Sequence, residues 1–386
     1  MREAVIVDAV RTAVGKRNGS LSEIHPADLS AVVLNAIAAR TGVDPAEVDD
    51  VVWGCVSQAG EQTFDIARTA VLSAGWPESV PGTTVDRQCG SSQQAVHFAA
   101  AGVISGQYDL AVAGGVESMS RVPIGAAMEW ANGQTPIGSR YAERYSAEFP
   151  SQGLGAEEIA GRWGLTRQRL DEFSARSHEN LGAAIDAGRF ESQIVPVELA
   201  DGGEFAIDEG LRPGTSVESL AGLKSAFRED GVLTAGNSSQ ISDGAAALLI
   251  ASAEKASALG LEPIARIHTA CLAGSDPNIM LTAPIPATEK LLEKSGVSIA
   301  EIGVFEVNEA FASVPLAWLA ETGADEAALN PNGGAIAIGH PLGGSGARIM
   351  TTMVHDMRER GIRYGLQTMC EGGGQANATL VELLAA

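Results

Sequence analysis

Basic residues are scarce in this chain. Its 386 residues include 26 Lys and Arg against 48 Asp and Glu, which gives a formal net charge of −22. A nucleic acid is therefore excluded as a partner, because binding to its phosphate backbone requires a basic surface. A small anionic ligand would need a locally positive site on an otherwise negative protein.

Cysteine is also rare, and long hydrophobic runs are missing. Cys55, Cys89, Cys271 and Cys370 lie too far apart in the sequence for zinc-ligand pairs and are too few for a disulfide framework. We therefore expect free thiols, some of them catalytic, and no bound metal. The longest apolar stretch, near residues 245–253, is far shorter than the roughly 20 residues of a membrane-spanning helix, and the charged N-terminal segment does not resemble a signal peptide. These features predict a cytoplasmic protein without membrane insertion.

Glycine and apolar residues are abundant instead. The chain contains 45 Gly, 45% of its residues are hydrophobic and only 19% are charged. At roughly 100–200 residues per domain, the length predicts two or three domains, each with a proper core. A disordered or fibrous chain is excluded, and the composition is typical of a large α/β enzyme with many close backbone approaches.

Two segments of the chain repeat one another at a constant offset of 254 residues. Residues 43–48 and 297–302 both have the pattern of a helix start, with a capping residue, a Glu three positions later and flanking apolar residues. Each is preceded by a predicted amphipathic helix and followed by a short buried strand, at residues 51–53 and 304–307.

The correspondence continues further along the chain. Residues 109–115 and 364–370 are predicted strands that each follow a Gly-bounded helix and end in a Gly turn. The repeat is far too long for a solenoid. We therefore predict two α/β halves that arose by duplication and pack face to face.

The segment between the two halves differs in character. Residues 119–241 contain several prolines and a long helical stretch at 156–189. We expect this segment to be an inserted loop or lid domain that binds a ligand. The N-terminal core half would then comprise residues 1–118, completed by 242–262, and the C-terminal core half residues 263–386.

Cys89 is the first candidate for chemistry. It follows a β-branched segment and precedes a predicted helix. A thiol at the N-terminal end of a helix faces unpaired N–H groups, and we expect these to lower its pKa and favour the thiolate. From its position alone, a buried and inert cysteine is an equal alternative.

His340 is the second candidate, in a glycine-rich loop ahead of another predicted helix. Such a loop permits close backbone approach to a ligand, but it lacks the Lys-Ser/Thr pair of a phosphate-binding loop and does not fit a dinucleotide motif. A lone histidine is more often structural. Asn308 and Cys370 lie at the ends of predicted strands, where polar groups of α/β sites gather, and each is ambiguous by itself.

Four sequence blocks together are far more specific than any one of them. In chain order they are Cys89-Gly90-Ser91, Asn308-Glu309-Ala310-Phe311, Gly339-His340-Pro341, and Cys370 before Gly372-Gly373-Gly374. With these blocks the chain resembles, over nearly its whole length, the thiolases, the acyl-CoA acetyltransferases of the thiolase superfamily. The resemblance implies an α/β thiolase-like fold, in which two duplicated βαβαβαββ-type halves form a layered α/β/α/β/α sandwich with an inserted loop domain.

The resemblance also implies roles in the cleavage of a 3-ketoacyl-CoA by coenzyme A. Cys89 would be the nucleophile, His340 would accept its proton, and Cys370 would protonate the departing acetyl-CoA enolate. Asn308 would hold a water that stabilises one oxyanion together with His340, while the backbone amides of Cys89 and Gly372 stabilise the other. Coenzyme A is then a co-substrate, no cofactor is bound permanently, and a homodimer or homotetramer is expected.

The inserted segment resembles the CoA-binding loop domain of the family. Arg212 corresponds to the residue that stacks on adenine, and Ser239 to the residue that contacts the pantetheine amide. Gln152 and Gln240 depart from the pattern of short-chain thiolases near the expected acyl pocket, which favours an acyl group larger than acetoacetyl. The other expected substrate contacts are Phe227, Phe311, Lys224 and Arg228, the last two as a local positive field or, equally, as a solvated charged face.

Three alternatives remain open at this point. An acetyl-CoA acetyltransferase specific for acetoacetyl-CoA would use the same chemistry on a shorter substrate. A ketoacyl or hydroxymethylglutaryl-CoA synthase of the same superfamily has a nucleophilic cysteine but not the second one, so Cys370 argues against it. A non-catalytic acyl-CoA or lipid carrier on the same fold would not need the four reactive residues.

Overall fold

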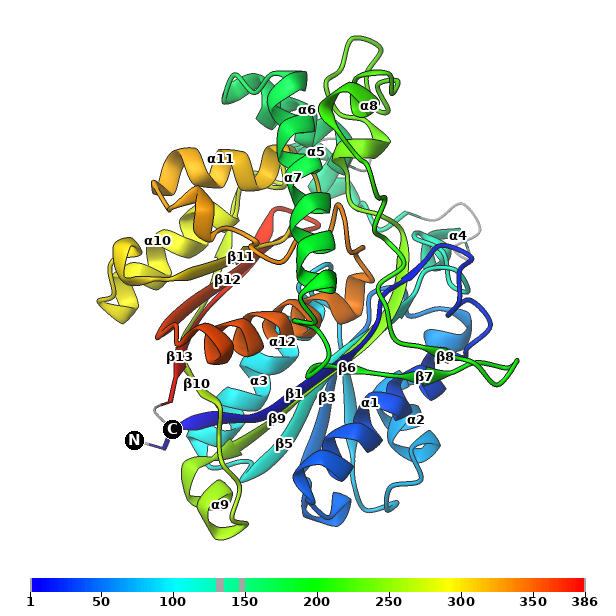
Figure 1. Ribbon diagram of the computed structural model, residues 1–386, viewed down its shortest axis with the longest axis vertical. Helices are drawn as coiled ribbons and strands as arrows, with labels where there is room; N and C mark the ends of the chain where they lie inside the picture. Colours follow the sequence, from blue (N-terminus) through cyan, green and yellow to red (C-terminus); the bar gives the residue numbers. More distant parts are fainter. Residues whose placement is uncertain (1, 130–134, 146–149, 385–386) are drawn as a thin grey trace.

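The computed structural model describes residues 2–129, 135–145 and 150–384 and contains two sets of strands between layers of helices (Figure 1). The first set has the spatial order β1 (Ala4–Thr12), β9 (Ser242–Ser252), β5 (Leu110–Ser118), β3 (Asp50–Gly54) and β4 (Gly82–Val85). The second set has the order β10 (Ala265–Gly274), β13 (Gln375–Leu383), β12 (Tyr364–Glu371) and β11 (Val304–Val307).

Helices cover both outer faces and fill the space between the two sets of strands (Figure 1). α1 (Pro26–Thr41) and α2 (Ile66–Ser73) pack on the first set, and α10 (Pro284–Ser295) and α11 (Ser313–Thr322) on the second. α3 (Ser91–Ser105) and α12 (Leu342–Arg360) form the middle layer, where their apolar side chains pack with those of both sets of strands. The predicted α/β/α/β/α sandwich is therefore confirmed.

The two sets of strands have the same connectivity. β1, β9, β5 and β3 correspond in order to β10, β13, β12 and β11, and in both sets the first two pairings are antiparallel and the last is parallel. In the second set, a parallel bridge between Phe305 and Leu329 corresponds to the parallel pairing of β3 with β4 in the first set. β1 and β10 also pair with each other, through Val5 with Arg266 and Ile6 with Ala265, so the two sets join into one continuous sheet.

The repeated capping segments do not begin α-helices, and that prediction is wrong. They form single 3-10 turns, Pro45–Glu47 and Ile299–Glu301. Ser298 and Glu301 make both hydrogen bonds of a capping box. The chain must nevertheless enter β3 at Asp50 and β11 at Val304, so no room is left for a longer helix. The capping pattern marked the place of a turn and not its length.

Most helices of the segment between β5 and β9 lie at the end of the molecule shown at the top of Figure 1, and its short strands lie lower, beside the first set of strands. β6 (Ile194–Val195) pairs with β1, and the chain then returns through the 3-10 turn Ala235–Asn237 into β9, which lies between β1 and β5. The helices of this segment are α4 (Ala126–Glu129), α5 (Ser139–Arg144), α6 (Gln152–Arg162), α7 (Arg167–Asp186) and α8 (Val217–Ala221). Two short pairings remain: β2 (Gly15–Lys16) pairs with β9, and β7 (Val197–Glu198) pairs with β8 (Glu204–Phe205). The other elements are α9 (Ala253–Ala258) and the 3-10 turns Gly60–Gln62 and Glu326–Ala328.

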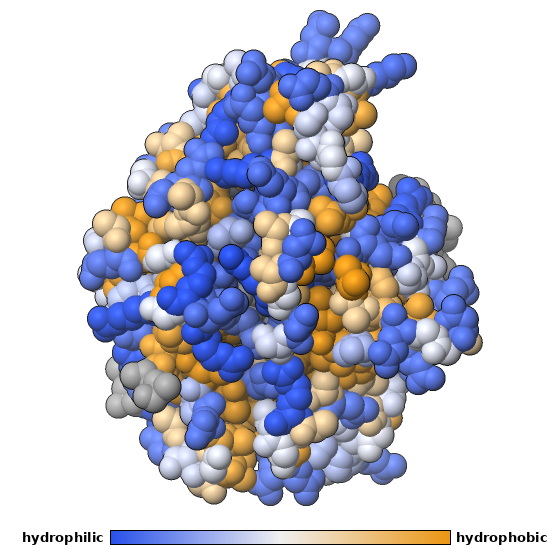
Figure 2. Space-filling model, viewed as in Figure 1, coloured by the Kyte–Doolittle hydropathy of each residue, from blue (hydrophilic) through white to orange (hydrophobic). Residues whose placement is uncertain are grey.

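Hydrophilic residues predominate on the face of the molecule shown in Figure 2, and hydrophobic residues show in patches near its middle. This agrees with a composition rich in acidic residues, which keep the outer layers in contact with water. Among the helices in the described part of the chain, none is long and apolar enough to cross a membrane.

Candidate active site

Cys89 lies immediately before α3, in the middle layer of the sandwich. Its side chain is buried. The preceding residue, Gln88, has a φ of 49°, in the left-handed region, so the backbone turns sharply between β4 and the helix. The thiol packs in a small apolar cluster with Leu342, Ile349 and Met369.

Burial outweighs the effect of the helix on this thiol. We expected the N-terminal end of α3 to lower the pKa of Cys89, and that expectation is wrong for the resting protein. Burial raises the pKa of Cys89 to about 12, and the nearby carboxyl of Glu371 adds to the rise. The thiol is therefore protonated at neutral pH, and a base has to take its proton as the sulfur attacks.

Cys370 approaches the same place from the other half of the molecule. It is buried near the end of β12, and burial raises its pKa, with a further rise from the neighbouring Cys89. Gly372 follows in the turn between β12 and β13, where a Cβ atom would lie 2.8 Å from Oε1 of Gln88. The turn after Cys370 therefore contacts the turn before Cys89.

His340 is held in one orientation by hydrogen bonds. Its Nδ1 lies 2.6 Å from Ser345 Oγ, and that hydroxyl donates to the Pro341 carbonyl at 2.9 Å. Because the hydroxyl has only one proton, its oxygen accepts from Nδ1–H, which leaves Nε2 unprotonated. Burial, together with the charge of Arg348, lowers the pKa of His340 to about 3, so the ring is neutral at physiological pH. A neutral imidazole with an unprotonated nitrogen is the form that accepts a proton.

The side-chain amide of Asn308 donates a long hydrogen bond to the unprotonated nitrogen of His340. Asn308 follows β11, and its Nδ2 is 3.4 Å from Nε2 of the histidine. Its Oδ1 is buried and has no hydrogen-bond partner within the described ranges, so it is available to a water or a substrate group. Because β11 pairs with β12 in parallel, Asn308 and Cys370 come from the same ends of adjacent strands.

A buried carboxyl group attaches the start of α12 to the first half. Glu117, in β5, accepts hydrogen bonds from the backbone N–H groups of Gly343 at 2.8 Å, Val56 at 2.9 Å and Ser57 at 3.0 Å. Leu342, which precedes Gly343, packs against Cys89. The structure thus brings Cys89, Cys370, Asn308 and His340 to the centre of the sandwich, where the two halves meet.

A groove of about 590 Å³ lies next to the loop of His340. One of its lining residues, Gln240, accepts a hydrogen bond from the His340 backbone N–H at 3.1 Å. Glu209 also lines it, but the Glu209 carboxylate is engaged with the backbone N–H of Lys16 at 3.0 Å. The groove brings together Arg212, Ser239, Lys16 and Arg17. Lys16, Arg17 and Arg212 form a locally positive site of the kind that an anionic ligand of this acidic protein needs.

The two predicted aromatic residues pack against each other at the start of α6. Phe227 packs edge-on against Phe311 with 5.6 Å between ring centroids. Gly153 permits this approach, because a Cβ atom there would lie 2.1 Å from the ring of Phe227. Gln152, the first residue of α6, is half-buried next to this pair.

Two other predicted substrate residues lie elsewhere. Lys224 and Arg228 are exposed and line neither this groove nor an adjoining one of about 780 Å³ that shares Arg212. Of the two interpretations left open for them, a solvated charged face fits these positions better. The positive field at the groove comes from Lys16 and Arg17 instead.

Gln240 has a structural role that its place in the motif did not reveal. Its Nε2 donates to the backbone carbonyls of Gly210 at 2.8 Å, Ile336 at 2.9 Å and Ala337 at 3.1 Å. The side chain therefore connects the loop before Arg212 to the glycine-rich loop before His340. These contacts do not support our use of Gln240 as a sign of a wide acyl pocket.

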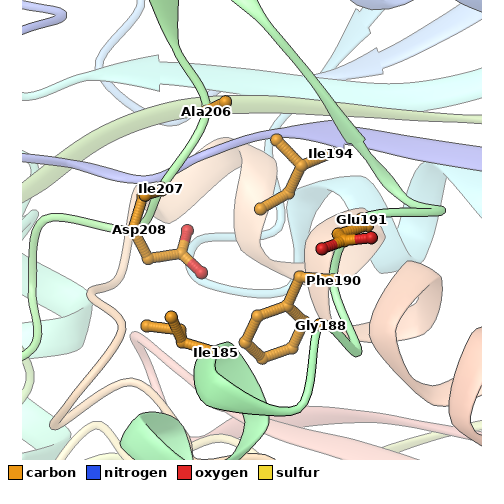
Figure 3. Close-up of a pocket in the computed structure, with 8 residues that line it drawn as sticks. All are labelled: Ile185, Gly188, Phe190, Glu191, Ile194, Ala206, Ile207 and Asp208. Atoms are coloured by element: carbon orange, nitrogen blue, oxygen red, sulfur yellow. The ribbon is translucent and has the colours of Figure 1, made fainter.

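A separate small pocket contains none of the predicted residues. Figure 3 shows Ile185, Phe190 and Ile194 around a cavity of about 150 Å³, with the carboxylate of Asp208 beside it. That carboxylate is already paired with the buried Arg11 at 2.8 Å. Within residues 2–129, 135–145 and 150–384, no group of three or more His, Cys, Asp or Glu side chains has the arrangement of a metal site.

Comparison with family models decides the classification. The model described as Thiolase, N-terminal domain matches residues 4–254, and that described as Thiolase, C-terminal domain matches residues 261–383. This chain belongs to the thiolase family. The resemblance found in the four sequence blocks is thereby confirmed, as is the assignment to an acyltransferase class that uses CoA as a substrate.

Individual relatives of this thiolase are similar to it in sequence over nearly their whole lengths. A steroid 3-ketoacyl-CoA thiolase of Mycobacterium tuberculosis is 51% identical over 389 residues, covering 100% of this chain and 95% of that protein. A 3-oxoadipyl-CoA/3-oxo-5,6-dehydrosuberyl-CoA thiolase of Escherichia coli is 45% identical, covering 99% and 100%. The crystal structure of an acetyl-CoA acetyltransferase of Bacillus anthracis superposes with a TM-score of 0.91 at 39% identity, covering 100% and 99%.

Sequence reasoning missed three residues of this site. Ser345 follows Gly343 and Gly344 in the sequence, and a hydroxyl five residues after a candidate base was a usable signal. Lys16 and Arg17 belong to the segment around β2, far in sequence from Arg212, and their place in the groove depends on a contact that no linear motif contains.

Replacing Ser345 by Ala should slow acylation of Cys89 by about 10- to 100-fold, because His340 then loses the partner that keeps its Nε2 unprotonated, a smaller loss than removal of the base itself. Rapid-quench acylation with a 3-ketoacyl-CoA measures the rate. Thr351→Val is the matched control, since the Thr351 hydroxyl makes the same type of bond within α12, to the Ala347 carbonyl at 2.9 Å, without a histidine. Equal rates in the two variants would contradict this role of Ser345.

Proposed function

We propose that this thiolase uses coenzyme A to cleave a 3-ketoacyl-CoA into acetyl-CoA and an acyl-CoA shortened by two carbons, and that it catalyses the reverse condensation. The observation that carries the proposal is that two buried thiols, Cys89 and Cys370, are neighbours, and that Leu342, two residues after a neutral His340, packs against Cys89. Two successive half-reactions each need a nucleophile and a proton carrier. Cys89 is the first nucleophile and the CoA thiol the second, and His340 and Cys370 carry the protons.

In the first half-reaction, the sulfur of Cys89 attacks the 3-keto carbon while its proton passes to Nε2 of His340. The bond between C2 and C3 of the substrate breaks, and its electron pair leaves as the enolate of acetyl-CoA. Cys370 gives its proton to C2 of that enolate. The acyl group remains on Cys89 as a thioester, and Cys370 remains as the thiolate.

In the second half-reaction, the Cys370 thiolate takes the proton of an incoming CoA thiol as that thiol attacks the thioester carbon. The sulfur of Cys89 leaves and recovers its proton from His340. The protein therefore returns to its starting protonation state, with both thiols neutral. This agrees with the raised pKa values that burial gives both cysteines.

Two sets of donors would stabilise the oxyanions of these steps. The backbone N–H groups of Cys89 and Gly372 belong to turns that contact each other, which supports a shared role at the tetrahedral oxygen. Asn308, with its unengaged Oδ1, is placed to hold a water beside His340 for the thioester oxygen of the enolate.

The two cysteines should have separable functions. With a 3-ketoacyl-CoA and no free CoA, mass spectrometry should find the acyl group on the peptide that contains Cys89, and Cys89→Ala should take up none. Cys370→Ala should still be acylated by a simple acyl-CoA but should fail to exchange the α-protons of acetyl-CoA with solvent. Cys271→Ala, which changes a buried core thiol outside the site, is the control and should behave as the wild type in both assays. Normal exchange in Cys370→Ala would remove its assigned role.

We further propose that the phosphates and adenine of CoA lie along the groove of Lys16, Arg17 and Arg212. The support is electrostatic, because three cations gather there on a protein of net charge −22. Ser239 is in the same lining, and its backbone N–H donates to the Ala310 carbonyl at 2.9 Å, which places it between the groove and the Asn308 block.

Arg212→Ala and the double change Lys16→Ala, Arg17→Ala should each raise the KM for CoA about 3- to 30-fold with little change in kcat, because the lost contacts act equally on bound substrate and transition state. Arg228→Ala, an exposed cation outside the groove, should leave KM unchanged. A fall in kcat alone would give these residues a different function.

We also propose that the natural acyl group is larger than acetoacetyl. Gln152 supports this, because an amide is costly to bury against a short apolar chain and is tolerated where the pocket holds water or a polar substrate group. Two relatives whose names give steroid and oxoadipyl substrates align with this chain over at least 99% of its length.

Thiolysis kinetics with different substrates measure this preference. We expect a higher kcat/KM for a 3-ketoacyl-CoA of eight or more carbons, or for one with a ring or a polar terminus, than for acetoacetyl-CoA. A clear preference for acetoacetyl-CoA would instead make this protein an acetyl-CoA acetyltransferase of short-chain specificity.

A further inference from the structure

Glu371 is a buried carboxyl group that the reaction described above does not use. It stands between Cys370 and Gly372 at the end of β12 and is fully buried. Neither side-chain oxygen makes a hydrogen bond of normal geometry within the part of the chain that the structure describes, although the backbone N–H of Asn377 favours the charged form. A buried carboxylate without such partners is costly.

The carboxyl group lies against the residue that follows the nucleophile. A Cβ atom on Gly90 would stand 1.9 Å from Glu371 Oε1 and 2.7 Å from Asn377 Oδ1, so these two oxygens adjoin the same point. Asn377 Oδ1 is also buried and, among the described residues, has no partner. The Nδ2 of Asn377 lies 3.3 Å from both Gln94 Oε1 and His97 Nδ1, which sets the orientation of the amide.

Two adjoining acceptor oxygens without a donor are explained by a proton on one of them. A carboxylic acid at Glu371 would donate its O–H to Asn377 Oδ1 and satisfy both atoms. Burial favours this neutral form and raises the pKa of Glu371 to about 8. The group is therefore mostly neutral at pH 7 and loses its proton in mild base.

The charged groups around Glu371 act in opposite directions. Arg87, in the turn before Cys89, favours the ionised carboxylate, and Asp86 opposes it. His97, on the far side of Asn377, contributes no charge, since burial lowers its pKa to about 3. The remaining titratable neighbours are the two thiols, both of which the charge of Glu371 affects.

We propose that Glu371 is a positioning residue that works as a neutral acid: its proton forms the hydrogen bond to Asn377 Oδ1, and loss of that proton suppresses thiolate formation at Cys89. The inference rests on the proposed function of Cys89 as the nucleophile. Among the charges that raise the pKa of Cys89, that of Glu371 acts more strongly than those of Glu117 and Asp86. An ionised Glu371 carboxylate beside Gly90 opposes a second negative charge on the neighbouring Cys89 sulfur.

The pH dependence of Cys89 alkylation tests this proposal. Iodoacetamide reacts with the thiolate, and mass spectrometry of the Cys89 peptide gives the rate. In the wild type the rate should rise about tenfold per pH unit up to about pH 8 and less steeply above it, because the ionised Glu371 then opposes the thiolate. Glu371→Gln is neutral at every pH, so its rate should continue to rise as steeply as before. The ratio of variant to wild-type rates should therefore increase, by up to about tenfold, between pH 7 and pH 9.

Glu306→Gln is the matched control. Glu306 is buried in β11, burial likewise raises its pKa to about 8, and one of its side-chain oxygens also lacks a partner among the described residues. It is not among the groups that affect either thiol. Glu306→Gln should therefore show the same decrease in slope as the wild type.

Parallel alkylation profiles in the wild type and in Glu371→Gln would overturn the proposal, since Glu371 would then be ionised already, with Arg87 as its counter-charge. Infrared difference spectra give a second readout that does not require Glu371→Gln to fold. In Glu306→Gln, the infrared band of a protonated carboxyl group should disappear as the pH rises through about 8. If no carboxyl band titrates near pH 8 in this variant, the proposal is also overturned. A wild type that alkylates as expected but cleaves no 3-ketoacyl-CoA would contradict the proposed function instead, so the two failures are distinguishable.

Discussion

The rest of the structure depends on one constraint: the first turns of α3 and α12 lie in direct contact with the backbones of β3 and β5. A Cβ atom on Gly54 of β3 would lie 2.3 Å from Ser92 N of α3, and one on Gly115 of β5 would lie 2.3 Å from the Gly343 carbonyl oxygen of α12. No other residue type fits there unless the backbone moves. Because Cys89 and the loop of His340 immediately precede these two helices, the same contact positions the proposed nucleophile and base.

The closeness of this packing also sets the protonation states in the site. Burial keeps the thiols of Cys89 and Cys370 protonated and His340 neutral, so the resting site contains no thiolate–imidazolium pair. Charge then develops only when a substrate brings a carbonyl that the backbone donors can stabilise. A neutral Glu371 belongs to the same arrangement, since one more buried negative charge would act against the nucleophile.

The groove proposed for the charged part of the substrate lies outside this neutral centre. The cations of the groove come from the N-terminal segment around β2 and from the loop that carries Arg212, both outside the middle layer. Gln240 connects that loop to the backbone before His340 through its three carbonyl contacts. Hydrogen bonds therefore connect the groove to the loop before His340, although the groove and the proposed reacting groups differ in polarity.

The duplicated architecture was predictable from the sequence, because periodicity and glycine placement are local properties. The four candidate residues came from motifs that resemble those of a known family, and their roles are proposals. The length of the 3-10 turns, the partners of Gln240 and the place of Lys16 and Arg17 were not, because they depend on segments far apart in the chain. The sequence by itself determined which chemical groups are present and where glycine permits close approach. Only the tertiary structure decided the protonation of Cys89, His340 and Glu371, because desolvation and charge interactions depend on distances that a linear motif does not contain.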